Sequence, residues 1–267
     1  MSLLFFSLAP FRFRRAENWL VIAGSLSLRY ALISDIHGNL EALTTVLREI
    51  SKENPDSLIC LGDVIGYGAN PEECAQIIRK EADVCIMGNH EAAIIGTLNI
   101  DYFTPYARTA ALWTRSQVSE DTIKWAYKLP LAGKIDNFTI VHGSLFQPDM
   151  FNYVQTIADA EYNFKAMETP LLFLGHSHQP LAFFNTNPMT YTLGPDIDLN
   201  FEEKNIVNIG SVGQPRDENP MAAFAIYDNE AQQVRLHRVP YDISTAADKI
   251  LKAGLPEALA MRLSAGR

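Results

Sequence analysis

Five short apolar segments in this chain each run directly into a cluster of aspartate, histidine, asparagine or glycine. The clusters are Asp35-Ile36-His37, Gly62-Asp63, Gly88-Asn89-His90, His142-Gly143 and Gly175-His176-Ser177-His178. Apolar runs this short are typical of buried strands. Between the earlier runs, the apolar residues have the spacing of a helix. Alternating strands and helices favour a parallel sheet. We therefore expect the clusters to meet in the crevice outside the carboxyl ends of the strands.

Residues 29–267 are predicted to form one α/β domain. The strand–helix rhythm breaks over residues 99–134, where loosely helical spacing indicates a helical insertion whose aromatic residues are expected to pack in the core. After residue 180, short apolar runs separated by turns indicate antiparallel strands. The tail from Ser244 is expected to be helical.

Residues 1–28 differ from the rest of the chain. Arg12, Arg14 and Arg15 precede an apolar run over residues 19–28. This order could be a weak targeting segment such as a signal peptide, although no small-residue cleavage site follows closely. An additional strand or a surface arm is a second interpretation. The third is a misplaced translation start, with the native start at the codon for Leu28.

The residue types in the clusters predict a metal centre. Imidazole and carboxylate ligands without cysteine suit Mn²⁺, Fe²⁺ or Zn²⁺. The candidates exceed what one ion needs, so two ions that share one carboxylate fit better. In Asp-x-His and His-x-His, extended backbone would direct both side chains to the same side. The candidate ligands are Asp35, His37, Asp63, Asn89, His142, His176 and His178, whereas His237 is interpreted as structural or exposed.

The net charge and the cysteine content exclude further classes of function. The net charge of -9 disfavours non-specific nucleic-acid binding, which depends on lysine and arginine. Three cysteines are too few for a disulfide framework and favour a reduced, cytoplasmic setting. No apolar run reaches the ~18 residues of a membrane-spanning helix. Arg216 could bind a phosphate oxygen of a substrate, or pair with a neighbouring acid such as Asp217.

Together, the five clusters resemble the pattern of the calcineurin-like metallophosphoesterases. Residues 34–40, 62–68 and 210–217 are similar to the small bacterial and archaeal phosphodiesterase branch, and the likeness covers roughly residues 29–240. It implies a four-layer α/β/β/α sandwich and a dinuclear metal centre. One ion would be bound by Asp35, His37, Asp63 and His178, and the second by Asp63, Asn89, His142 and His176, with Asp63 bridging. The resemblance implies that His90 is the acid that protonates the leaving group.

The expected activity is hydrolysis of a phosphodiester bond in a small or nucleotide-like substrate, through in-line attack of a hydroxide that bridges two ions. Two divalent ions and two aspartates leave the site doubly positive. A hydroxide and a phosphodiester monoanion would neutralise that charge, and a phosphomonoester dianion would exceed it. The alternatives are a phosphomonoesterase or protein phosphatase, a dinucleoside polyphosphate hydrolase, and a non-catalytic scaffold of the same fold. A scaffold would be marked by missing ligands, and none is missing here.

Overall fold

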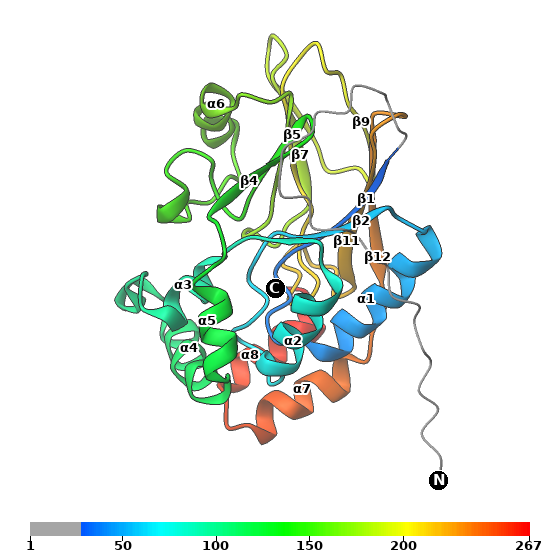
Figure 1. Cartoon of the computed structure of the whole chain (residues 1–267). Coiled ribbons are helices and arrows are strands. Elements are labelled where there is room, and N and C mark those ends of the chain that lie inside the picture. The colour runs from blue at the N-terminus through cyan, green and yellow to red at the C-terminus, as the bar shows by residue number, and fades with distance from the viewer. Residues whose placement is uncertain (1–27) are drawn as a thin grey trace.

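The computed structural model describes residues 28–267 and contains two six-stranded sheets (Figure 1). The interpretations of residues 1–27 as a targeting segment, an arm or a misplaced start lie outside the described residues. Leu28 itself lies at the start of the fold, because its backbone N–H donates to Asn229 Oδ1 at 2.7 Å.

The first sheet has the strand order β3-β2-β1-β11-β12-β9. The first three strands along the chain pair in parallel, whereas β11, β12 and β9 join them antiparallel. Its strands are β1 (Arg29–Ile33), β2 (Ser57–Cys60), β3 (Val84–Cys85), β9 (Asp196–Asp198), β11 (Ala222–Asp228) and β12 (Gln233–Val239).

The second sheet has the strand order β4-β5-β6-β10-β7-β8. Its strands are β4 (Ala132–Ile135), β5 (Phe138–Val141), β6 (Leu171–Leu174), β7 (Leu181–Phe184), β8 (Thr190–Thr192) and β10 (Asn205–Asn208). The prediction of antiparallel pairing after residue 180 is wrong for one contact, since β10 pairs parallel with β6 and antiparallel with β7. The cause is topological: the chain forms β8 and β9 before it returns beside β6.

The two sheets pack against each other through alternate residues of their strands. In β1, Tyr30 and Leu32 join an apolar cluster that includes Phe138 and Phe173 of the second sheet. The intervening residues Ala31 and Ile33 join the cluster that includes the helices on the other side. A strand buried on both faces reads as a continuous apolar run, which explains why alternation is absent from its sequence.

Helices form the outer layers of the sandwich. On the first sheet, α1 (Leu40–Glu53) and α2 (Pro71–Glu81) bury apolar side chains, and Asn39 Oδ1 caps α1 by accepting from Ala42 N at 3.1 Å. On the second sheet, α6 (Ile157–Ala166) buries Ala160 and Phe164, and it lies apart from the other helices in Figure 1. The C-terminal helices α7 (Ile243–Lys252) and α8 (Glu257–Ala265) pack on each other, and α7 contacts α1. The expected four-layer α/β/β/α sandwich is confirmed.

The segment interpreted as a helical insertion is helical over most of its length. It contains a short 3-10 turn (Ile100–Tyr102), α4 (Pro105–Gln117) and α5 (Glu120–Ala126). The strand β4, at the edge of the second sheet, follows these helices and begins at Ala132. Within residues 28–267, no helix combines the length and apolar composition that crossing a membrane requires.

Candidate metal centre

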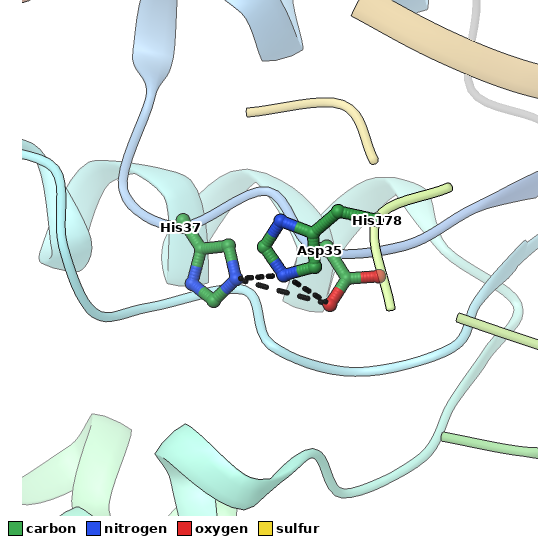
Figure 2. A group of neighbouring side chains, drawn as sticks. All are labelled: Asp35, His37 and His178. Carbon is green, nitrogen blue, oxygen red and sulfur yellow. Dashed lines mark hydrogen bonds and ion pairs between the residues drawn. The ribbon is translucent and has the colours of Figure 1, made fainter. Parts of the chain in front are cut away.

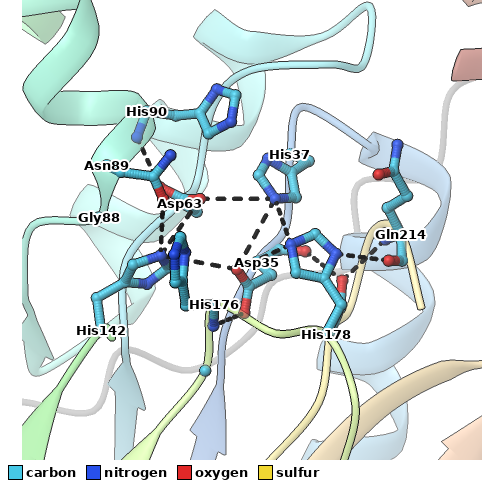
Figure 3. A network of polar contacts seen from close by, with 12 residues as sticks. Asp35, His37, Asp63, Gly88, Asn89, His90, His142, His176, His178 and Gln214 are labelled. Carbon is cyan, nitrogen blue, oxygen red and sulfur yellow. Dashed lines mark hydrogen bonds and ion pairs between the residues drawn. The ribbon is translucent and has the colours of Figure 1, made fainter. Parts of the chain in front are cut away.

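All seven candidate ligands lie together, just beyond the ends of five strands (Figure 3). Three of these strands, β1, β2 and β3, belong to the first sheet, and β5 and β6 belong to the second. The expected convergence therefore occurs between two packed sheets rather than outside one open sheet. The aspartate and histidine candidates are all buried, and the most exposed of them, His176, is 7% exposed. His237 lies elsewhere, on β12, where its ring stacks on Phe224.

The first group of ligand atoms comes from Asp35, His37 and His178 (Figure 2). His178 Nε2 lies 3.2 Å from Asp35 Oδ1, and His37 Nε2 lies 3.8 Å from the same oxygen. The two imidazole Nε2 atoms are 3.1 Å apart. Asp35 Oδ1 is buried and accepts no hydrogen bond from any residue between 28 and 267.

The second group comes from Asp63, His142 and His176, with Asn89 beside it. His142 Nε2 lies 3.3 Å from Asp63 Oδ2 and 3.2 Å from Asn89 Oδ1. Asp63 Oδ2 also lies 3.6 Å from His37 Nε2, in the first group. Asp63 thus stands between the two groups, where a bridging carboxylate would be needed.

Backbone carbonyls determine which imidazole nitrogens face the site. The Nδ1 atoms of three histidines lie within hydrogen-bond distance of carbonyl oxygens: His37 with Ile65 at 3.1 Å, His142 with Leu61 at 2.8 Å and His178 with Gln214 at 2.6 Å. A carbonyl can only accept, so each Nδ1 carries a proton, and each ring presents an Nε2 lone pair to the site when it is neutral. The Nε2 lone pairs of neutral imidazole rings and the carboxylate oxygens then face the same small region. This donor set, without thiolate, fits divalent ions such as Mn²⁺, Fe²⁺ or Zn²⁺.

The charges of His37 and His178 agree with that arrangement, whereas His142 differs. Burial holds the pKa values of His37 and His178 below their usual range, which keeps both rings neutral. Burial disfavours protonated His142 too, but the carboxylates of Asp63 and Asp35 outweigh it and raise its pKa to about 10. The neighbouring histidines hold the pKa of Asp63 well below its usual range despite its burial. In the metal-free protein, a proton on His142 therefore balances part of the carboxylate charge.

The backbone of the ligand loops is left-handed rather than extended. Five of the candidate ligands have positive φ: Asp35 (53°), His37 (52°), Asp63 (51°), His176 (64°) and His178 (60°). The expectation that Asp-x-His and His-x-His converge through extended backbone is therefore wrong, although the side chains do meet. Such φ values are uncommon outside glycine and cluster at functional sites, where the surrounding structure holds them.

Two glycines allow the loops to approach one another. A Cβ at Gly88 would lie 2.1 Å from Asp63 Oδ1, and one at Gly175 would lie 2.1 Å from Ser34 Oγ. Both distances are far below van der Waals contact, so only glycine fits these positions without a shift of the site.

His90 lies beside these two groups, and its ring forms a third group of possible ligand atoms with His37 and Asp63. Its backbone N–H donates to Asp63 Oδ1 at 2.8 Å, and its ring contacts those of His37, Tyr67 and Phe103. Burial lowers the pKa of His90 to about 4, and its Nδ1 has no hydrogen-bond partner among the described residues. A role as an acid therefore requires the negative charge of a bound phosphoester to favour its protonated form.

Arg216 lies at the site and not in the alternative ion pair. Asp217 pairs with Arg238 instead. The Arg216 guanidinium lies 5.7 Å from the centre of the Tyr67 ring, and its Nη2 donates to Gln214 Oε1 at 2.9 Å. Its Nε is buried without a partner among the described residues. The guanidinium therefore retains hydrogen-bonding capacity next to the ring that covers His37 and His90.

The model of the calcineurin-like phosphoesterases matches residues 28–209 of this sequence. The chain belongs to the calcineurin-like phosphoesterase family. Like other members of this metal-dependent family, it carries aspartate and histidine groups that could bind ions.

Relatives of this family member come from archaea and bacteria. It is 38% identical to an uncharacterized protein of Methanocaldococcus jannaschii over 244 residues, which cover 89% of this chain and 98% of the relative. A metallophosphoesterase structure from Sphaerobacter thermophilus matches with a TM-score of 0.82 and 37% identity, covering 91% of this chain and 100% of that one. A hypothetical protein of Pyrococcus horikoshii shares the fold, with a TM-score of 0.73 and 22% identity over 90% of this chain and 98% of that one.

One acidic residue of this phosphoesterase was missed by the sequence reasoning. Glu91 is fully buried at the start of α3 (Asn89–Ile95), directly after Asn89 and His90. Its carboxylate accepts four backbone N–H groups: Asp63 at 2.8 Å, Val64 at 2.9 Å, Ile65 at 3.3 Å and Gly88 at 2.9 Å. It therefore ties the loop after β2 to the loop after β3. An acid at the third position of a helix is a capping-box signal, which could have revealed part of this role.

We expect Glu91→Gln to weaken Mn²⁺ binding by about 10–100-fold, the range typical of residues that orient metal ligands. Both carboxylate oxygens of Glu91 accept hydrogen bonds from four backbone N–H groups. The amide of glutamine has only one acceptor oxygen, and its N–H₂ group cannot accept from the others. Calorimetric titration of the metal-free protein with Mn²⁺ measures the effect. Glu49→Gln is the matched control, since Glu49 pairs only with Lys52 on the surface of α1. Wild-type affinity in Glu91→Gln would contradict this role.

Proposed function

We propose that this chain is a dinuclear-metal-dependent phosphoesterase that hydrolyses phosphodiester bonds of a small or nucleotide-like substrate. The proposal depends chiefly on one observation: imidazole nitrogens oriented by backbone carbonyls converge with the carboxylates of Asp35 and Asp63, and Asp63 lies between the two groups. The proposed ligands of one ion are Asp35, His37, Asp63 and His178, and those of the other are Asp63, Asn89, His142 and His176.

The chain's own residues would position the substrate and handle protons around that centre. Bound divalent ions would supply a deprotonated water near neutral pH and stabilise charge on the phosphoryl oxygens. Arg216, with an unpartnered Nε, would donate to a phosphoryl oxygen. His90, next to Asn89 and within the group that contains Asp63, would donate a proton to the departing oxygen.

The diester preference follows from charge. Two divalent ions and two aspartates would leave two positive charges, which hydroxide and a diester monoanion neutralise. The three cysteines are free thiols, which supports a reduced, cytoplasmic setting as part of the proposal. The complete ligand set speaks against a non-catalytic scaffold.

The test is a substrate panel with the metal as the variable. We expect the chelator-treated protein to be inactive and Mn²⁺ to restore hydrolysis of bis-p-nitrophenyl phosphate above that of p-nitrophenyl phosphate. Cyclic nucleotides and diadenosine tetraphosphate complete the panel. Faster hydrolysis of the monoester or the tetraphosphate would replace the diester assignment with a phosphomonoesterase or a dinucleoside polyphosphate hydrolase. Full activity of the metal-stripped protein would contradict the mechanism itself.

A further inference from the structure

Tyr153 lies over the second group of ligands with much of its ring in solvent. Its ring stacks on the imidazole of His176, with centroids 4.2 Å apart and planes inclined by 13°. The side chain is nevertheless 48% exposed, whereas His176 beneath it is buried. A half-exposed aromatic ring parallel to a proposed ligand presents a flat apolar surface at the entrance to the site.

The segment that carries Tyr153 is fixed on both sides of this residue. Phe151 is buried and its ring packs near His142, and Val154 is buried in the apolar cluster beneath α6. On the N-terminal side of Tyr153, the backbone of Gly143 lies so close that a Cβ on Gly143 would be 3.0 Å from the carbonyl oxygen of Asn152. The ring is therefore held over the site before any ligand arrives, which lowers the entropic cost of using it as a contact surface.

Aromatic rings also border the metal groups next to His37 and His90. Tyr67 contacts His37 and His90, and Phe103 contacts His90, with centroid distances of 4.5, 4.5 and 5.3 Å. Tyr67 and Phe103 are half-buried and tilted against these imidazole rings, whereas Tyr153 is half-exposed and stacks parallel to its histidine. Phe103 belongs to the segment whose aromatic residues were expected only to pack in the core.

We infer that Tyr153 is a stacking platform for a planar aromatic group of the substrate, with a nucleobase as the chemical class that fits it. This inference depends on the proposed function, because the phosphoester must bind at the metal groups for its base to reach the ring. Stacking on an aromatic side chain is available to every nucleobase, since each has a π-face. The platform thus selects nucleotides over sugar phosphates without selecting one base.

The test compares two ligands that share a phosphate and a ribose and differ in the base. Adenosine 5′-monophosphate and ribose 5-phosphate are titrated calorimetrically into the full chain loaded with Mn²⁺. We expect the nucleotide to bind more tightly by roughly 5- to 150-fold, the range that one stacked base contributes. Tyr153→Leu should reduce this ratio to about one through loss of nucleotide affinity alone, and Tyr153→Phe should retain it. Tyr106→Leu is the control, since Tyr106 is similarly exposed, at 47%, but lies on α4.

The outcomes separate this inference from the proposed function. Equal affinities for both ligands in the wild type, or an unchanged ratio in Tyr153→Leu, would overturn the platform while leaving phosphate binding intact. Equal weakening of both ligands, or loss of bound Mn²⁺ in Tyr153→Leu, would mean that the tyrosine serves only to position His176. Binding of neither ligand to the metal-loaded wild type would contradict both the platform and the proposed phosphoester site.

Discussion

Replacing Asp63 by asparagine should lower kcat/KM for bis-p-nitrophenyl phosphate by roughly 10³-fold or more, because two groups of ligand atoms depend on this one carboxylate. Asn89→Ala should cost less, roughly 10–100-fold, since Asn89 serves one group only. Asparagine is among the residues that tolerate positive φ, so the 51° conformation of Asp63 survives the change and the loss reports on chemistry. Steady-state kinetics at saturating Mn²⁺, together with the metal content of each variant, measure the difference.

Asp196→Asn provides the reference for this comparison. Asp196 is an exposed aspartate of β9 that pairs with Arg235. Because β9 is an edge strand of the first sheet and carries no candidate ligand, the Asp196 variant should retain wild-type kinetics. If Asp63→Asn and Asn89→Ala proved equally active, Asp63 would not be the shared ligand. Asp35, whose Oδ1 also lies 3.8 Å from His142 Nε2, would then be the better candidate for the bridge.

The second expected result concerns His90. His90→Asn should keep its bound metal, yet lose about 10²–10⁴-fold in kcat on a nucleotide diester and much less on a nitrophenyl diester. A p-nitrophenolate departs readily without a proton, whereas a ribose alkoxide needs one. The two rates are measured on the same metal-loaded preparation, so that only the leaving group differs.

His237→Asn is the matched control for His90, because His237 is a half-buried histidine that stacks on Phe224 away from the site. It should leave both rates unchanged. Equal losses on both substrates in His90→Asn would indicate that His90 positions the substrate or a ligand loop. Loss of metal would make His90 itself a ligand, as its proximity to His37 and Asp63 allows.

Much of the fold could be predicted because its information is local. The strand Leu171–Leu174 is continuously apolar, and Phe138–Val141 is apolar except for Thr139, as expected of strands that are buried on both faces. The convergence of the clusters was also predictable, because parallel strands end at a common edge. The grouping of Asp35, His37 and His178, which follow strands of two different sheets, was expected from the family resemblance and not from strand topology.

The remaining features depend on contacts that local patterns do not record. β9 has three residues and one buried side chain, Ile197, which is too little for a periodicity to show. The left-handed ligand loops are held by long-range backbone hydrogen bonds, such as His37 N to Asp63 O at 2.9 Å and Gly213 N to Asp35 O at 2.9 Å. In the sequence, Glu91 resembles an ordinary acidic residue of a helix, because three of the four backbone N–H groups that it binds come from a distant loop. Phe103 contacts His90 only because the insertion folds back over the site.

The position of β11 in the first sheet shows that the folded domain extends beyond the residues that match the family. The family match ends at residue 209, yet β1 lies between β2 and β11, and Ala31 pairs with Ile226. A chain that ended at the matched boundary would leave β1, the strand that delivers Asp35 and His37, as an unpaired sheet edge, and such edges are prone to aggregation. During synthesis, the ligands carried by residues 35–178 would all precede the strand that completes their sheet. The candidate metal ligands of this chain are therefore synthesised before the strand that completes the first sheet.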